Sequence, residues 1–151
     1  RDITPLLGDA EGLRAVLDGM ASMARDLSPG CIVGIESRGF IFGAPLADRL
    51  GLPFVPVRKP GKLPAARMSV EYSLEYGESR LDIHEDAMPP GARALIVDDL
   101  LATGGTALAA AKLVELIGGV VAGLIFAIEL EALAGRPRLA SYTVRSLVAY
   151  A

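Results

Sequence analysis

The residues best suited to do chemistry lie in one stretch, from Ala94 to Thr106, where an apolar run meets two aspartates and a Thr-Gly-Gly-Thr sequence. The apolar run predicts a buried strand, and a helix is expected to begin at Thr106. In a parallel sheet, the loop between such a strand and helix lies at the carboxyl edge, where ligands bind. Gly104 and Gly105 allow successive backbone N–H groups to point into one concavity, to which the helix N-terminus and the threonine hydroxyls add. The sequence therefore predicts a phosphate-binding loop.

The two aspartates of this stretch, Asp98 and Asp99, would repel a phosphate, so we expect them to face ribose hydroxyls and a magnesium ion instead. The alternative is a solvated strand end, followed by an ordinary helix N-cap at Thr106. Two common phosphate-binding patterns are missing from the sequence, since it has no G-x-x-x-x-G-K-[ST] and no G-x-G-x-x-G after a strand. The loop and the aspartates together fit a ligand that carries both a phosphate and a ribose.

A second polar group, Glu36-Ser37-Arg38-Gly39, follows the short apolar run Cys31–Ile35. Because that run also predicts a strand, this group is expected to face the same edge as the phosphate loop. Arg38 offers a planar, bidentate donor for a pyrophosphate, and Gly39 permits close approach of the backbone. The alternative is an exposed ion pair between Glu36 and Arg38, which would contribute little to stability.

The segment from Phe54 to Val70 is basic, although the chain as a whole is acidic, with a net charge of −3. It contains Arg58, Lys59, Lys62 and Arg67 and no acidic residue. An anion such as pyrophosphate is its expected partner, and the alternative is a solvated basic loop. The overall acidity argues against a general nucleic-acid binder, and the low aromatic content of 5% argues against stacking along a single strand.

The elements that must position these residues alternate between apolar runs of strand length and longer segments of helical period. Helices are expected over 11–27, 41–50 and 106–117, strands over 31–35, 54–57, 80–83, 93–97, 120–128 and 146–150, and a helical turn over 131–134. In a chain of 151 residues, of which 52% are hydrophobic, this alternation predicts one α/β domain over 1–151 with a mainly parallel sheet covered on both faces. The proline in 54–57 favours an edge strand. Residues 58–77 show no sustained period, which predicts a lid or a disordered loop.

Residues outside these groups suggest few further functions. Cys31, the only cysteine, indicates a reducing, cytoplasmic setting and is expected in the core. His84, the only histidine, is expected at the surface, and one cysteine with one histidine cannot build a catalytic triad or a zinc site. Arg136 and Arg138 are expected to be solvated or to complement a helix dipole. The longest apolar stretch, 116–128, is shorter than a membrane span needs, so no membrane partner is expected.

Residues 97–106 resemble the phosphoribosyl-pyrophosphate motif of the type I phosphoribosyltransferases. Segments 1–7, 34–40, 58–64 and 71–77 resemble, in this order and spacing, the branch of that family that acts on adenine. The resemblance implies a mainly parallel central sheet flanked by helices, with a long mobile loop over the site. It implies transfer of the 5-phosphoribosyl group from phosphoribosyl pyrophosphate to adenine, giving AMP and pyrophosphate, with Mg2+ carried by the phosphoribosyl pyrophosphate, and a homodimer. The alternatives are another base, such as xanthine or orotate, or a non-catalytic regulator that senses phosphoribosyl pyrophosphate and binds nucleic acid.

The resemblance also assigns roles to matching positions of this sequence. The 5-phosphate would be held by Ala102, Thr103, Gly104, Gly105 and Thr106, and the ribose hydroxyls by Asp98 and Asp99. The pyrophosphate would be held by Glu36, Ser37, Arg38 and Gly39, together with Lys59 and Lys62. Arg58 would lie near the subunit interface and serve the neighbouring site. The resemblance thus implies one site built from three separate segments.

The adenine side of the site depends on segments whose residue pattern alone says little. Residues 71–77 would form the mobile loop that closes over the site, bringing in Glu75 to handle a proton of the adenine ring while Tyr76 covers the site. The alternative is that the glutamates of this segment form the charged face of a solvated loop. The backbone around Arg1, expected to be extended, would read the adenine edge, and Leu130 would pack on the base. Because the chain begins inside this segment, we expect part of the full protein's N-terminus to be missing.

Overall fold

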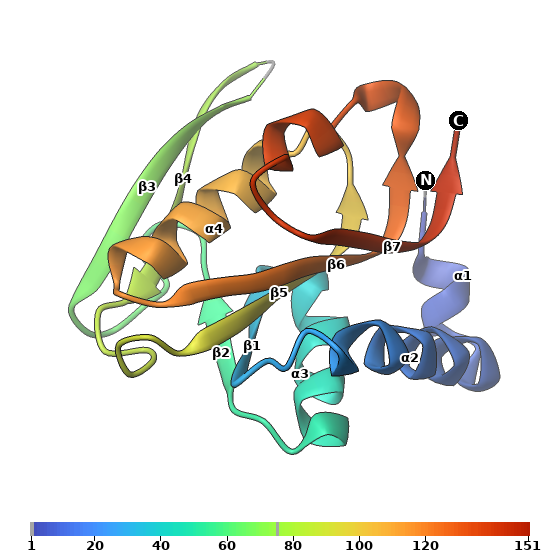
Figure 1. The fold of residues 1–151 in the computed structure, drawn as a ribbon. Helices are drawn as coiled ribbons and strands as arrows, with labels where there is room; N and C mark the ends of the chain where they lie inside the picture. Colours follow the sequence, from blue (N-terminus) through green and yellow to red (C-terminus); the bar gives the residue numbers. More distant parts are fainter. Residues whose placement is uncertain (1, 75) are drawn as a thin grey trace.

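A five-stranded, wholly parallel sheet forms the centre of the molecule in a computed structural model that describes residues 2–74 and 76–151 (Figure 1). The strands, in the order β2-β1-β5-β6-β7, are β2 (Phe54–Val57), β1 (Cys31–Ile35), β5 (Arg93–Leu101), β6 (Val120–Leu130) and β7 (Val144–Tyr150). The expected parallel α/β sheet is confirmed, and so is the edge position of the proline-containing strand β2. All five strands are at least as long as their predicted spans, and β5 extends through both aspartates to Leu101 rather than ending at Val97.

Helices cover both faces of the sheet because the central strands are apolar on both sides. Leu95 and Val97 of β5 pack with α2 (Ala10–Arg25) and α3 (Arg38–Leu50), whereas Ala94 and Ile96 pack with α4 (Gly105–Leu116) on the other face. The three predicted helices are therefore present, with α3 beginning three residues earlier than expected, at Arg38. None of the helices in the described part of the chain is long and apolar enough to cross a membrane.

The N-terminal segment forms a short helix, α1 (Thr4–Leu7), where an extended chain was expected. Pro5 lies in its first turn, a position in which the fixed backbone angle of proline suits a helix and its missing N–H is not needed. The extended segment was expected before Pro5, and of its described residues Thr4 already belongs to the helix.

Residues 58–77 were predicted to be a lid or a disordered loop, but much of this segment belongs to an antiparallel hairpin of β3 (Arg67–Leu74) and β4 (Gly77–His84). Alternate residues of β3, Met68, Val70 and Tyr72, pack against the core on the α4 side while their neighbours face outward. Figure 1 shows the two green strands running alongside α4. The hairpin thus supplies a wall beside the edge of the sheet where the phosphate loop was expected.

Backbone hydrogen bonds at the buried residue Asp82 join the hairpin to the residue that follows β2. The side chain of Asp82 is fully buried, accepts a hydrogen bond from Ser69 Oγ at 2.7 Å and pairs with Arg67 and Arg80. The backbone of Asp82 also exchanges two hydrogen bonds with Arg58. The hairpin is therefore held in a defined position beside the basic segment.

The isolated cysteine and histidine lie in different environments from one another. Cys31 is in the core, as expected, and burial raises the pKa of its thiol. His84 was expected at the surface, but it is half-buried, and its Nε2 is enclosed without a hydrogen-bond partner among the described residues. The prediction for His84 was wrong because the residue ends a strand whose neighbours are covered by α4.

Candidate active site

A cleft of about 850 Å³ opens where the carboxyl ends of β1, β2 and β5 meet. One side is formed by the residues that follow β1 and β2, another by the end of β5 and the start of α4, and a third by the hairpin. The predicted site residues that line it are Glu36, Ser37, Arg38, Lys59, Tyr76, Asp98, Asp99, Ala102, Thr103, Gly104, Gly105 and Thr106. Three segments that are far apart in sequence thus border one cavity at the ligand-binding edge of the sheet.

The loop from Ala102 to Gly104 turns sharply into α4. Gly104 has a φ of +84°, in the left-handed region that favours glycine, and precedes the first helical residue. A Cβ atom at this position would also lie 2.7 Å from the carbonyl oxygen of Gly135. The first N–H groups of an α-helix have no acceptor within the helix, so those of α4 are free to bind an anion in the cleft.

The aspartate pair lies within the last part of β5, beside the first turn of α3. Asp99 is buried and forms an ion pair with Arg38, in which Oδ2 of the carboxylate lies 2.9 Å from Nε of the guanidinium. Asp98 Oδ1 accepts the backbone N–H of Asp99 at 2.9 Å. Burial, with the added charge of Asp99, raises the pKa of Asp98 well above its ordinary value of 3.8. Asp98 is therefore a strong acceptor that needs hydrogen-bond donors from a ligand when it is ionised.

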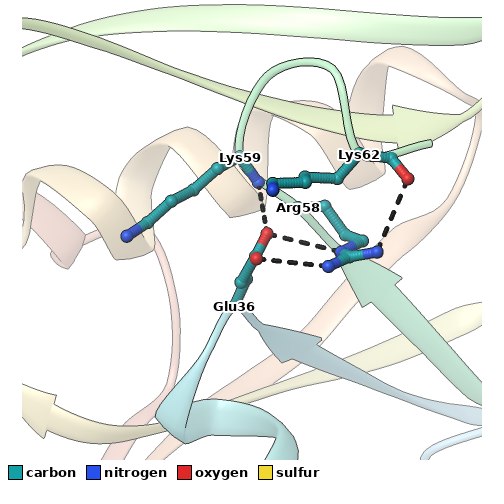
Figure 2. A network of polar contacts seen from close by, with 4 residues as sticks. All are labelled: Glu36, Arg58, Lys59 and Lys62. Atoms are coloured by element: carbon teal, nitrogen blue, oxygen red, sulfur yellow. Dashed lines mark hydrogen bonds and ion pairs between the residues drawn. The ribbon is translucent and has the colours of Figure 1, made fainter.

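Glu36 holds the basic segment in place, as Figure 2 shows. Its carboxylate accepts the backbone N–H of Lys59 at 2.8 Å and pairs with Arg58 at 3.2 Å. Burial opposes ionisation of Glu36, but the hydrogen bonds from Lys59 and Arg58 together outweigh it and lower the pKa. The exposed ion pair between Glu36 and Arg38 considered from the sequence does not form, because Arg38 pairs with Asp99. The peptide between Glu36 and Ser37 is cis.

The side chain of Lys59 extends away from Glu36 (Figure 2) and lines the cleft. Arg58 and Lys62 are outside the lining formed by the described residues, and the carbonyl of Lys62 accepts a hydrogen bond from Arg58 at 3.5 Å. Of Arg58, Lys59 and Lys62, only Lys59 lines the described cleft. Glu36 and Arg58 therefore act as supports for the segment that presents Lys59.

The remaining predicted site residues do not all line the cleft. Gly39 is buried in α3, where a Cβ atom would lie 2.9 Å from the carbonyl oxygen of Val97, so it permits close packing of α3 on β5. Leu130 is half-buried at the end of β6 and outside the described lining. Arg1 and Glu75 lie outside the described residues. Tyr76, at the tip of the hairpin, is 90% exposed and borders the cleft.

Several lining residues were missed from the sequence, namely Tyr72, Ser73, Leu74, Leu81, Leu100, Leu101, Ala107, Leu133 and Arg138. The hydroxyl of Tyr72 is 3.5 Å from Thr106 Oγ1 and accepts its hydrogen bond, so the hairpin contacts the start of α4. The alternation of Met68, Val70 and Tyr72 with polar residues is the signal that could have indicated a strand here.

Arg136 was expected to be solvated or to complement a helix dipole, and it is exposed, but it also pairs with the buried Glu129. Its Nε donates to the two carboxylate oxygens of Glu129 at 2.8 and 3.0 Å, and its Nη1 donates to the carbonyl of Val144 at 2.8 Å. Burial opposes ionisation of Glu129, but the hydrogen bonds from Arg136 and Ser146 outweigh it and lower the pKa. The pairing was not predicted from the sequence, and it arises because a buried carboxylate at the end of β6 requires a charged partner.

The similarity of this chain to known proteins covers nearly its whole length. A family model described as a phosphoribosyl transferase domain matches residues 9–148. An adenine phosphoribosyltransferase from Clostridium perfringens is 59% identical over 150 residues, covering 99% of this chain and 87% of the relative. The crystal structure of an adenine phosphoribosyltransferase from Thermoanaerobacter pseudethanolicus has a TM-score of 0.97 at 53% identity and covers 99% of this chain and 87% of that one.

A more distant structure adds a ligand to this comparison. The adenine phosphoribosyltransferase from Saccharomyces cerevisiae, complexed with an imino-altritol bisphosphate and adenine, has a TM-score of 0.90 at 39% identity and covers 95% of this chain and 83% of that one. All the described segments that line the cleft fall within the residues that the family model matches.

Proposed function

This chain belongs to the phosphoribosyltransferase family and transfers a phosphoribosyl group to adenine, and from that premise we propose how its cleft performs the reaction. Adenine and phosphoribosyl pyrophosphate react to give AMP and pyrophosphate. The observation that carries the proposal is that the glycine loop, the aspartate pair and Arg38 all border one cleft. That combination suits a substrate with a phosphate at one end, a ribose in the middle and a pyrophosphate at the other.

The 5-phosphate binds at residues 102–106. The backbone N–H groups at the start of α4 donate to the phosphate oxygens, and the partial positive charge of the helix N-terminus adds to the attraction. The hydroxyls of Thr103 and Thr106 supply further donors. This end of the substrate does not react, so its role is to position the ribose carbon for attack by adenine.

The aspartates hold the ribose, and the cations receive the leaving group. Asp98 and Asp99 accept hydrogen bonds from the ribose hydroxyls, which compensates the ionised form of Asp98. Arg38 and Lys59 face the pyrophosphate, on which negative charge develops as the bond to the ribose carbon breaks. Cations fixed in advance stabilise that charge without reorganising, so the reaction needs no nucleophile from the protein.

Mg2+ is expected to arrive with phosphoribosyl pyrophosphate. The described residues contain no cluster of three or more His, Cys, Asp or Glu side chains that could hold a metal ion, so the protein offers no cage of its own there. Mg2+ commonly binds through one or two carboxylates together with substrate oxygens and water, and Asp98 and Asp99 fit that mode. When bound, it would neutralise charge on the pyrophosphate.

Glu75 is proposed to assist a proton transfer at the adenine ring, with Tyr76 covering the site. We expect Glu75→Gln to lower kcat by about 100-fold while changing the KM for adenine little, because loss of a general acid or base affects the chemical step. Steady-state kinetics with adenine as the varied substrate measure both constants. Glu71→Gln, four positions earlier in the sequence and outside the described cleft lining, is the matched control. An unchanged kcat for Glu75→Gln would contradict this role.

The function itself is tested by AMP formation from adenine, phosphoribosyl pyrophosphate and Mg2+, with hypoxanthine, xanthine and orotate as competing bases. Preferential AMP formation is the expected result. Efficient use of another base would contradict the specificity, and binding of phosphoribosyl pyrophosphate without turnover would favour the regulator.

We also propose a homodimer in a cytoplasmic setting, with Arg58 near the subunit interface. Sedimentation of the wild type and of Arg58→Ala would test the homodimer and the position of Arg58.

A further inference from the structure

The two arginines on either side of Pro137 have different surroundings, although they lie on one short 3₁₀ turn, η2 (Arg136–Leu139). The guanidinium of Arg136 is occupied by Glu129 and by the carbonyl of Val144. The side chain of Arg138 makes no hydrogen bond or ion pair with any described residue. Residues two apart on a turn of three residues point in different directions, so one arginine faces the sheet while the other is free to face elsewhere.

The side chain of Arg138 lines the cleft beside the start of α4. Its Nη1 lies 3.4 Å from the point that a Cβ atom of Gly105 would occupy, so the guanidinium sits directly against the first helical residue. Figure 1 shows the turn between β6 and β7, in orange-red, beside the beginning of α4. The guanidinium is therefore adjacent to the N–H groups that form the phosphate loop.

The position of Arg138 relative to this loop is fixed by close backbone packing. A Cβ atom at Gly135 would lie 2.4 Å from the carbonyl oxygen of Ala102, and one at Gly104 would lie 2.7 Å from the carbonyl oxygen of Gly135. Leu139, the residue after Arg138, is fully buried and anchors the turn to the core. The loop and the turn that carries Arg138 therefore form one packed unit.

The charges in the cleft explain why such a residue is needed. Among the described residues that line it, the cations are Arg38, Lys59 and Arg138, and Arg38 is already paired with Asp99. The loop itself offers only dipoles and hydroxyls, with a helix N-terminus equivalent to about half a charge. A phosphate monoester carries nearly two negative charges at neutral pH, and a guanidinium that has no partner among the described residues suits it in charge and in geometry.

We propose that Arg138 binds the 5-phosphate of the substrate and of the product AMP, opposite the backbone of residues 102–106. This inference rests on the proposed function of the loop. It assigns to the 5-phosphate a side-chain cation that comes from a segment more than thirty positions further along the chain. Arg138 thereby favours phosphorylated ligands over their unphosphorylated counterparts.

Equilibrium binding by titration calorimetry tests the proposal, with ribose 5-phosphate and inorganic pyrophosphate as separate probes. We expect Arg138→Met to weaken ribose 5-phosphate binding by about 10-fold and to leave pyrophosphate binding unchanged, since a hydrogen bond to a charged group is the interaction lost. Arg138→Lys keeps the charge but not the planar fork, so a smaller loss is expected. Arg14→Met, at an exposed position of α2 outside the described lining, is the charge-matched control.

The outcomes separate this proposal from the proposed function. Ribose 5-phosphate binding that is the same in Arg138→Met as in the wild type, or an equal loss for pyrophosphate, overturns the role of Arg138 even when the wild type forms AMP. A selective loss for ribose 5-phosphate supports it even when the wild type forms no AMP. If Arg138→Met fails to fold, as judged by thermal unfolding, Arg138→Lys decides between the same two outcomes.

Discussion

Replacing Gly104 with alanine should raise the KM for phosphoribosyl pyrophosphate by about 100-fold or more, through two effects that act together. The backbone at this position has a φ of +84°, and an L-residue in the left-handed region costs about 1–2 kcal/mol. The new Cβ atom would also lie 2.7 Å from the carbonyl oxygen of Gly135, which is backbone and cannot rotate away. The loop must therefore shift, and its N–H groups lose their alignment on the phosphate. Steady-state kinetics with phosphoribosyl pyrophosphate as the varied substrate measure the effect.

A comparison with a second glycine separates the effect of backbone strain from the effect of a steric clash. Gly91 has a φ of +80°, nearly that of Gly104, but a Cβ atom there would meet nothing within 4 Å, and the residue precedes β5 at the amino end of the strand. Gly91→Ala should therefore lower the unfolding temperature, by about 2–4 °C for each kcal/mol lost at this chain length, and leave the KM unchanged. An unchanged KM in Gly104→Ala would show that the loop tolerates displacement or does not bind the phosphate.

The parts of the fold that could be predicted from sequence are those whose pattern is continuous along the chain. The buried strands at 31–35 and 93–97 are uninterrupted apolar runs, and a run of this kind is typical of a parallel sheet covered on both sides. Residues 80–83 of β4 were predicted as a strand, but β3 was missed because one of its faces is exposed, so its apolar residues occur only at every second position and are separated by polar ones. The prolines and glycines that precede β3 in the sequence also favoured the prediction of a loop.

The same distinction applies to the cleft. Residues 98–106 form one contiguous motif, so their types and spacing could be interpreted without knowledge of tertiary packing. Tyr72 and Arg138 reach the cleft from the hairpin and from the turn after β6, and nothing in their immediate neighbours predicts that approach. Gly39 was assigned to substrate contact, and the structure adds a second requirement, because the absence of a Cβ atom there also allows α3 to pack closely against β5. The positions of these residues depend on long-range packing, which local sequence patterns do not encode.

The second large effect is expected at Asp98, where function and stability should respond in opposite directions. We expect Asp98→Asn to lower kcat/KM by about 100-fold, because a neutral amide is a weaker acceptor for the ribose hydroxyls than a carboxylate. The same variant should unfold at a higher temperature near neutral pH. Burial, together with the charge of Asp99, raises the pKa of Asp98 in the folded protein, so the ionised carboxylate is disfavoured there relative to the unfolded chain. The asparagine oxygen can still accept the N–H of Asp99, so the geometry is preserved.

The pH dependence of that stabilisation identifies its cause. A raised pKa means that the folded state binds more protons than the unfolded state at a pH between the two pKa values. The contribution of Asp98 to the free energy of unfolding is therefore most favourable below its ordinary pKa of 3.8, and it is lost as the pH rises through the pKa of the folded state. The difference in Tm between Asp98→Asn and the wild type should therefore be small at about pH 4, close to the ordinary pKa, and larger at about pH 7.5. Asp99→Asn is the matched control, because it weakens the ion pair with Arg38 and should lower kcat/KM without raising the Tm. A Tm difference for Asp98→Asn that is equal at both pH values would mean that titration of this carboxyl does not cause the stabilisation. An unchanged kcat/KM would contradict the proposal that Asp98 binds the ribose.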